Sequence, residues 1–520
     1  MKRTTFRRPV RYLSIILTLC LMATFALCVA AYAETPKRGG TLIFARPDEP
    51  LTFDPFIPAD NGSIWALEQV CDSLTEADAT GEGLRPGLAE SWTISEDGLT
   101  YTLKLRDTTF SNGKPVTAED AIFSVQKIAD PNTSYGFAFE PIESMKALDP
   151  KTIEIKVKTP YTPLLAALSL FSAAVVSKED YLKDPDAFGQ KPVCCGAFVV
   201  DTYERGNKVV LKKREGYWDV GKDGKPLPYL DSIDMRYVPE SNSRVLGLRN
   251  KDFDVIGTVP FNQAKSVGAM PNVTLEVVPS YRLDYVYLNH KKAPIDNKKV
   301  RLAMNYAANR EASLKAVYFS YGEIPNSYMP KINFHANDVE KIPYDIEKAK
   351  TLVKESGYDG TVIKLMVDTG NAPFRQIANI LQQGWTEAGL KVEIVEYDVG
   401  TAFGMTEKGD YQAYVSYITS DINDTDELAI LQADYTGGAH AFFSWYENDD
   451  VVKWLREARK ESDPAKRAPI YAKVQKTVYW DGYSVPMNFV PSMHAFHDHV
   501  KGWQSLTTGW WWIKDVWVDK

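Results

Sequence analysis

The sequence predicts an α/β protein. The clearest observation is an alternation of strand and helix patterns between residues 345 and 420. A hairpin pattern at 92–109 and a strict apolar alternation at 152–158 add strands before it. The chain has 520 residues, 44% of them hydrophobic and 25% charged, which is an ordinary globular composition with length for several domains.

The first part of the chain is predicted to be rich in strands. Residues 41–45 form an apolar strand pattern. The hairpin expected at 92–109 turns at Glu96-Asp97-Gly98. Thr117 is predicted to begin a helix, because Asp120 lies three residues on, as in a capping box, and apolar residues then recur at helical spacing. The apolar run at 164–176 is too short to span a bilayer, so we expect a buried helix there.

The second part predicts a βαβ unit. Its expected elements, in order, are a helix at 345–356, a strand at 362–367, a helix at 374–388, and strands at 390–397 and 411–418. Close succession of strand, helix and strand favours parallel strands with a right-handed crossover. Ligands of such sheets bind beyond the carboxyl ends of the strands, and Asp421 lies just past the last of these strands.

The first 33 residues have the pattern of a secretory signal. Residues 2–11 carry five basic side chains and no acid, an apolar run follows, and Ala31-Tyr32-Ala33 ends it. We expect cleavage after Ala33 and export to the periplasm; an uncleaved membrane anchor is the alternative. Cleavage would change the net charge from −8 to −13, which argues against nucleic-acid binding.

Three cysteines follow this segment: Cys71, Cys194 and Cys195. An odd number leaves at least one of them without a partner in the chain. Adjacent cysteines bridge each other only with backbone distortion, so one option is a bridge from Cys71 to one of the pair. The other option is three buried free thiols. The sequence leaves both open.

No catalytic motif stands out. The sequence has no Gly-x-Ser-x-Gly elbow, His-Glu-x-x-His, phosphate-binding loop or Cys-x-x-Cys. His494, His497 and His499 form the one histidine cluster, and solvated histidines are favoured over metal ligands because no cysteine or carboxylate spacing completes a site. We therefore expect a binding protein without a cofactor; a secreted hydrolase is a distant alternative.

Several motifs occur together in a characteristic order. They are Gly-Leu-Ala-Glu-Ser-Trp at 87–92, Asp-Gly-Leu-Thr-Tyr-Thr-Leu at 97–103, Phe-Ser-Asn-Gly at 110–113, Thr-Ala-Glu-Asp at 117–120, Tyr-Trp at 217–218, Pro-Tyr-Leu-Asp at 228–231 and Val-Arg-Leu-Ala-Met at 300–304. This order resembles the periplasmic peptide-binding proteins of ABC importers, the family 5 extracellular solute-binding proteins of the oligopeptide, dipeptide and nickel types. The similarity covers residues 38–520.

The resemblance implies a two-lobed periplasmic-binding-protein fold with a hinge and an extra subdomain inserted in the first lobe. The domain limits it implies are a signal peptide at 1–33, lobe I at 34–77, 194–288 and 494–520, the inserted subdomain at 78–193 and lobe II at 289–493. It also implies a monomer that binds its ligand between the lobes and delivers it to the transmembrane subunits of an ABC permease.

The resemblance also implies ligand contacts. Residues 420–426 resemble the family loop whose first Asp pairs with the α-ammonium of a peptide, and Asp421 holds that position. The family often has an aromatic residue three places earlier, where this chain has Ile418 with Tyr417 beside it. Arg375 matches an Arg that binds the ligand's carboxylate in dipeptide receptors; the alternative is a surface residue of its helix.

The expected ligand is a short peptide, a dipeptide or oligopeptide. Within the same family, the alternatives are an opine, an amino-acid conjugate, a nickel complex or an oligosaccharide. Asp421, Arg375 and Tyr417 are the candidate ligand-binding residues.

Overall fold

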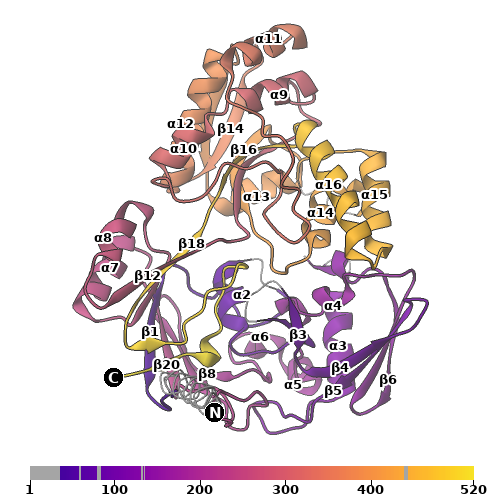
Figure 1. Cartoon of the computed structure of the whole chain (residues 1–520), viewed down its shortest axis with the longest axis vertical. Coiled ribbons are helices and arrows are strands. Elements are labelled where there is room, and N and C mark those ends of the chain that lie inside the picture. Colours follow the sequence, from indigo (N-terminus) through magenta and orange to yellow (C-terminus); the bar gives the residue numbers. More distant parts are fainter. Residues whose placement is uncertain (1–34, 58–59, 79–82, 131–132, 134, 438–442) are drawn as a thin grey trace, which may run out of the picture.

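The computed structural model describes residues 35–57, 60–78, 83–130, 133, 135–437 and 443–520. The predicted signal peptide, 1–33, lies outside this part of the chain. Two sheets form the centres of two lobes, and a smaller antiparallel sheet lies beside the lower lobe in Figure 1. The α/β class and the inserted subdomain expected from the sequence are therefore confirmed.

Lobe I, as we use the term here, is built around a seven-stranded sheet. In spatial order its strands are β12 (Val273–Val278), β18 (Ser492–His497), β11 (Val255–Gly257), β1 (Thr41–Arg46), β10 (Ser232–Tyr237), β9 (Lys208–Lys213) and β8 (Phe198–Glu204). β1 is parallel to β10 and β11, and the other pairs are antiparallel. Three helices accompany this sheet: α2 (Asn61–Leu67), α7 (Ser241–Asn250) and α8 (Ala264–Gly268). Two short ribbons are β2 (Thr75–Ala77) with β3 (Leu84–Pro86) and β19 (Val500–Lys501) with β20 (Trp517–Val518).

The inserted subdomain contains a four-stranded antiparallel sheet. Its strands, in spatial order, are β4 (Ala89–Ile94), β5 (Thr100–Leu105), β7 (Thr152–Val157) and β6 (Ile142–Asp149). Helices α3 (Ala118–Ile128), α4 (Leu164–Ala167), α5 (Lys178–Lys183) and α6 (Pro185–Phe188) complete it. The predicted hairpin and the capping box of Thr117 and Asp120 are confirmed. The predicted helix over 164–176 is wrong: only α4 forms, and the chain then turns at Phe171–Ala173 to pass between the cores of lobe I and the subdomain.

Lobe II is built around a five-stranded sheet. Its strands, in spatial order, are β15 (Val392–Tyr397), β14 (Ile363–Asp368), β16 (Ala413–Ile418), β13 (Leu283–Leu288) and β17 (Ser484–Phe489). The predicted βαβ unit is confirmed, because β14 and β15 are parallel and α12 joins them. The lobe's helices are α9 (Lys298–Tyr306), α10 (Arg310–Ala316), α11 (Ile346–Ser356), α12 (Ala372–Glu387), α13 (Val399–Glu407), α14 (Thr425–Ala433), α15 (Asp449–Lys460) and α16 (Pro464–Trp480).

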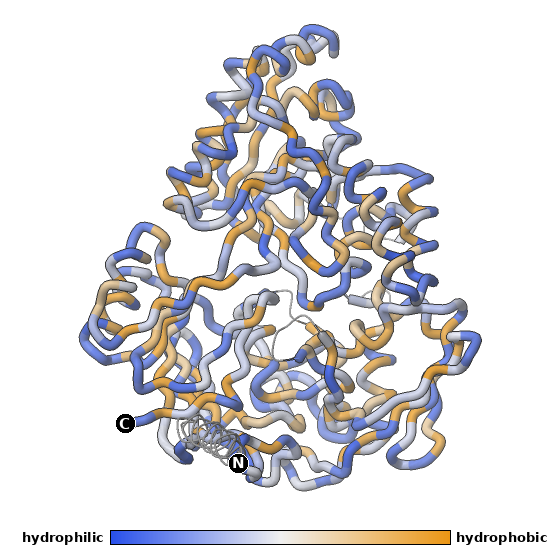
Figure 2. The backbone as a smooth tube through the Cα atoms, in the orientation of Figure 1, coloured by the Kyte–Doolittle hydropathy of each residue, from blue (hydrophilic) through white to orange (hydrophobic). Residues whose placement is uncertain are grey.

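Apolar strands fill both lobes, and polar turns and helix faces cover them, as the colours along the tube in Figure 2 show. The chain passes from the lobe I sheet to the lobe II sheet at 279–282, between β12 and β13. It returns to the lobe I sheet at 490–491, between β17 and β18. The domain limits expected at 288/289 and 493/494 lie a few residues beyond these points and stay predictions.

A disulfide bond joins two segments that are distant in sequence. Cys71 and Cys194 form a disulfide that joins the segment after α2 to the segment before β8, and Cys195 is a buried free thiol. Of the two options that the sequence left open, the bridge is therefore the one observed. Among the residues with described positions, no helix is long and apolar enough to cross a bilayer.

Candidate functional site

Asp421 lies at the junction between lobe II and the inserted subdomain. It follows β16 by three residues, at the edge of the sheet where the parallel strands β14 and β16 end. Tyr135, from the segment between α3 and β6, donates a hydrogen bond of 2.7 Å from its hydroxyl to Oδ2 of Asp421. A hydrogen bond therefore joins Asp421, on lobe II, to the inserted subdomain.

The carboxyl groups of Glu427 and Glu68 interact electrostatically with Asp421. Burial, and then the charge of Asp421, raise the pKa of Glu427 well above its ordinary value. Burial, followed by Asp421 and Glu76, does the same to the pKa of Glu68, at the end of α2 in lobe I. Burial also raises the pKa of Asp421, while the hydrogen bond from Tyr135 lowers it. Three acidic groups thus lie together where the lobes meet, and the raised pKa of each favours its neutral form.

Asp421 and Glu427 accept hydrogen bonds from neutral groups, and none of their described partners is a cation. Ser420 donates from its hydroxyl to Oε2 of Glu427 at 2.5 Å. Oε2 of Glu68 is buried and has no hydrogen-bond partner within the described ranges. Over the same ranges, Asp421, Glu427 and Glu68 form no ion pair. A buried acidic group without a cation can bind an ammonium with a large electrostatic gain, because the surroundings screen charge weakly.

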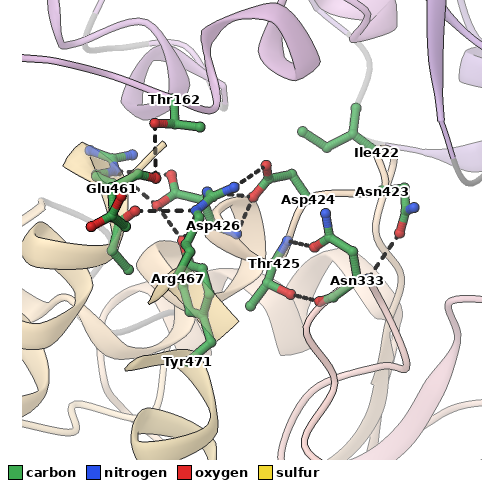
Figure 3. Close-up of polar contacts among 12 residues, drawn as sticks. Thr162, Asn333, Ile422, Asn423, Asp424, Thr425, Asp426, Glu461, Arg467 and Tyr471 are labelled. Atoms are coloured by element: carbon green, nitrogen blue, oxygen red, sulfur yellow. Dashed lines mark hydrogen bonds and ion pairs between the residues drawn. The ribbon is translucent and has the colours of Figure 1, made fainter. Parts of the chain in front are cut away.

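The loop that carries Asp421 is held rigidly by charged pairs (Figure 3). Asp424 caps α14 by accepting from the backbone N–H of Asp426, and it binds both terminal nitrogens of Arg467 at 2.9 Å. Asp426 pairs with Nε of Arg459 at 2.9 Å. These two acidic residues have arginine partners, whereas Asp421 has no cationic partner among the described residues.

The same loop also contacts the inserted subdomain. Ile422 is 5% exposed and packs in the apolar cluster of the subdomain, toward which it points in Figure 3. Nearby, the backbone N–H of Thr162 donates to the carbonyl of Arg459 at 3.0 Å, and its hydroxyl donates to the carbonyl of Glu461 at 3.1 Å. Lobe II and the subdomain are therefore in direct contact in this structure.

The other two predicted site residues lie on lobe II. Tyr417 is 40% exposed, and its ring lies 6.2 Å from that of Phe374. Arg375 follows Phe374 on α12 and forms an ion pair with Glu396 at 2.8 Å. Both of these side chains are 44% exposed. The one described ion pair of Arg375 thus joins it to β15 and not to Asp421. Ile418 is 6% exposed in the core of lobe II.

Sequence reasoning missed Tyr135, Glu68 and Arg282. The first two have no local signature, because each is far from Asp421 in sequence. Arg282 had one: Asp284 stands in the otherwise apolar β13, and a charge in a buried strand requires a partner. Arg282 is that partner: its Nε lies 2.7 Å from Oδ1 of Asp284, and its guanidinium lies 4.5 Å from the centroid of the Tyr417 ring.

The histidine cluster differs from the expectation that it would be solvated. His494 is 4% exposed and His497 is 5% exposed. Trp511 donates from Nε1 to Nε2 of His494 at 2.9 Å, and His499 lies 2.8 Å from Asp254. The expectation was wrong because β18 lies inside the lobe I sheet and the Trp-rich C-terminal segment covers it. Within the described residues, no His, Cys and carboxylate side chains are grouped as they would be around a metal ion.

Comparisons with known proteins agree with this architecture. Residues 83–439 match the family model described as bacterial extracellular solute-binding proteins, family 5 Middle. Glutathione-binding protein GsiB of Escherichia coli O1:K1 is 29% identical over 471 residues, which are 88% of this chain and 91% of GsiB.

Solved structures match over most of the chain. The periplasmic binding protein DppA from Helicobacter pylori, in complex with peptide STSA, is 26% identical with a TM-score of 0.82, covering 93% of this chain and 99% of DppA. AgaA from A. tumefaciens R10, in complex with agropinic acid, is 23% identical with a TM-score of 0.83, covering 92% and 99%.

The family model spans more than half of the chain, and the lobes and inserted subdomain correspond to those of the solved structures. The protein is accordingly a transport receptor and not an enzyme, and the chain belongs to the family 5 extracellular solute-binding proteins of ABC transporters.

Proposed function

We propose that this protein is a periplasmic receptor for short peptides, whose α-ammonium binds Asp421 and which it delivers to an ABC permease. The observation that carries the proposal is the partly buried carboxylate of Asp421, which has a hydroxyl partner and no cation within the described ranges. Repulsion by Asp421 contributes to the raised pKa values of Glu427 and Glu68, and a cation bound there would offset that repulsion. A site of this kind favours a cationic end group over a neutral one.

The relatives that are at least 25% identical favour a peptide over the other solutes of the family. GsiB is described as glutathione-binding, and glutathione is itself a tripeptide. DppA was solved with peptide STSA. AgaA with agropinic acid and NikZ from Campylobacter jejuni with Ni(L-His) are 23% and 21% identical, so they support the fold alone.

The remaining parts of the proposal concern the other end of the ligand and the route of the protein. Arg375 is the residue that the family resemblance offers for the peptide's carboxylate, and Tyr417 lies beside the bound chain. The protein is exported after cleavage following Ala33, acts as a monomer, and closes its two lobes on the ligand. Closure follows when a ligand contacts both lobes, because it then has a higher affinity for the closed state.

A thermal-shift screen tests the solute class. The purified protein, without residues 1–33, is mixed with dipeptides to pentapeptides, glutathione, opines and Ni²⁺–histidine in separate wells. A solute that binds only the folded state stabilises it by RT ln(1 + [L]/Kd). We expect peptides with free termini to raise Tm by several degrees. A shift with opines or nickel complexes alone would contradict the peptide assignment.

A further inference from the structure

Arg282 occupies a special place in the chain. It ends the segment 279–282 through which the strands change from the lobe I sheet to the lobe II sheet. All six residues of β13, which follows it, are buried, whereas the side chain of Arg282 is 35% exposed. A cation thus stands at the crossing between the lobes, in reach of solvent.

An ion pair with a buried carboxylate holds the Arg282 side chain in place. Nε of Arg282 donates to Oδ1 of Asp284 at 2.7 Å, and Asp284 is fully buried. The hydroxyl of Tyr318 donates to the other oxygen of the same carboxylate. A buried ion pair is weak evidence for stability, since two apolar residues often serve the fold as well or better. It does, however, hold the guanidinium in place through Nε, while the side chain stays 35% exposed.

The guanidinium is also held against an aromatic ring that the sequence had already marked. It lies 4.5 Å from the centroid of the Tyr417 ring, and Tyr417 is 40% exposed. Burial raises the pKa of Tyr417, Arg282 lowers it, and Asp48, which follows β1 in lobe I, raises it. The pair of Arg282 and Tyr417 therefore lies on lobe II within electrostatic range of lobe I.

Arg282 and Asp421 lie along one edge of the lobe II sheet. Leu283 pairs with Ile418 in the antiparallel register of β13 and β16, so Arg282 stands beside the first residue after β16. The neighbouring Tyr281 donates from its hydroxyl to the side chain of Asn423 at 2.7 Å, two residues past Asp421. One edge thus carries a carboxylate that has no cation among the described residues and an arginine whose side chain is 35% exposed.

We propose that Arg282 binds the carboxylate of the solute whose ammonium binds Asp421. The inference rests on the proposed function and names a second anchor for it. A guanidinium presents paired N–H donors that match a carboxylate, and one held by a buried acid and a ring loses little side-chain entropy on binding. Arg375 lacks that support, because both it and its partner Glu396 are exposed. Arg282, and not Arg375, thus decides whether the solute needs a free carboxylate.

The test uses calorimetry with the tetrapeptide Ser-Thr-Ser-Ala, its C-terminal amide and its N-acetyl derivative. The measured quantity is the ratio of Kd for the amide to Kd for the free acid. We expect wild type to favour the acid by about tenfold or more, as is typical of a hydrogen-bonded charged pair. Arg282→Gln should bring the ratio close to one, and Arg375→Gln should leave it unchanged.

Two further variants guard against a folding defect. Arg282→Lys keeps a charge beside Asp284 but loses the forked donors, so it should fold and give an intermediate ratio. Arg456→Gln, on an exposed arginine of α15 whose side chain is 58% exposed, should behave as wild type. If Arg282→Gln has the same ratio of amide Kd to acid Kd as wild type, this inference is wrong and the proposed function still stands. Equal binding of the free and N-acetylated peptide by wild type, or no binding of the tetrapeptide, overturns the proposed function with it.

Discussion

The hydroxyl of Tyr135 donates to Oδ2 of Asp421 at 2.7 Å, and so ties the inserted subdomain to the loop after β16. This bond favours the ionised form of Asp421, because it lowers a pKa that burial raises. The contact spans 286 positions in the sequence, so only the fold brings the two groups together.

The first prediction follows from that bond. Tyr135→Phe should raise the pKa of Asp421 further, and peptide affinity should then fall off at a higher pH than in wild type, since an ammonium needs the ionised acid. Loss of the hydrogen bond should also cost about 1 kcal/mol of stability. Calorimetric titrations between pH 5 and pH 8 measure both the midpoint and the affinity. A midpoint identical to that of wild type would show that the hydroxyl does not influence Asp421.

The second prediction concerns Asp72, whose pKa is raised to about 7 by burial and then by the charge of Glu76. The folded value exceeds the unfolded one, so the protonated group favours folding at low pH. The contribution of Asp72 to the free energy of unfolding falls by about 1.4 kcal/mol per pH unit between roughly pH 4 and pH 7, and it is constant above pH 7.

Asp72→Asn should therefore flatten the dependence of unfolding free energy on pH in that window. Urea unfolding at several pH values provides the measurement. Asp410→Asn, on a side chain that is 77% exposed, is the matched control and should keep the wild-type slope. If Asp72→Asn keeps that slope as well, the carboxyl of Asp72 is not the group responsible.

The third prediction concerns the contact between lobe II and the subdomain. Ile422 is 5% exposed in the subdomain's cluster, so Ile422→Asp should disfavour the state in which the two are joined. We expect at least a tenfold loss of peptide affinity and a larger radius of gyration in small-angle scattering of the peptide-saturated protein. Val399→Asp, at a residue that is 59% exposed on lobe II, should change neither. Undiminished affinity in Ile422→Asp would mean that this contact plays no part in closure.

The fourth prediction concerns the Cys71–Cys194 disulfide, which closes a loop of 123 residues. Its loss in Cys71→Ser/Cys194→Ser should lower the free energy of unfolding by about 2–5 kcal/mol. Reductant should have a similar effect on wild type and on Cys195→Ser, because Cys195 is a free thiol. Equal Tm values with and without reductant in unfolding scans would argue against the bridge.

Local patterns in the sequence were enough to predict the strands and helices that depend on neighbouring residues. The unit of β14, α12 and β15 followed from apolar periodicity, and the start of α3 from its capping box. The helix expected over 164–176 failed because apolar character alone does not distinguish a buried helix from a buried turn.

The candidate site was predictable only in part. The motif around Asp421 could be found because it is continuous in sequence. The contributions of Glu68 and Tyr135 depend on how separate domains meet, and no local pattern records that. Arg282 falls between these cases, since the acidic Asp284 in an apolar strand was a sign of a buried ion pair.

The most direct test of the account is calorimetry of Ser-Thr-Ser-Ala and its N-acetyl derivative with wild type and Asp421→Asn. Removing one partner of a buried charged contact costs about 2–5 kcal/mol, so wild type should bind the free peptide roughly 30-fold or more tighter than the acetylated one. Asp421→Asn should bind both weakly, with unchanged circular dichroism, and Asp410→Asn should match wild type. Equal affinity of wild type for the two peptides would contradict the assignment of Asp421 as the ammonium-binding residue.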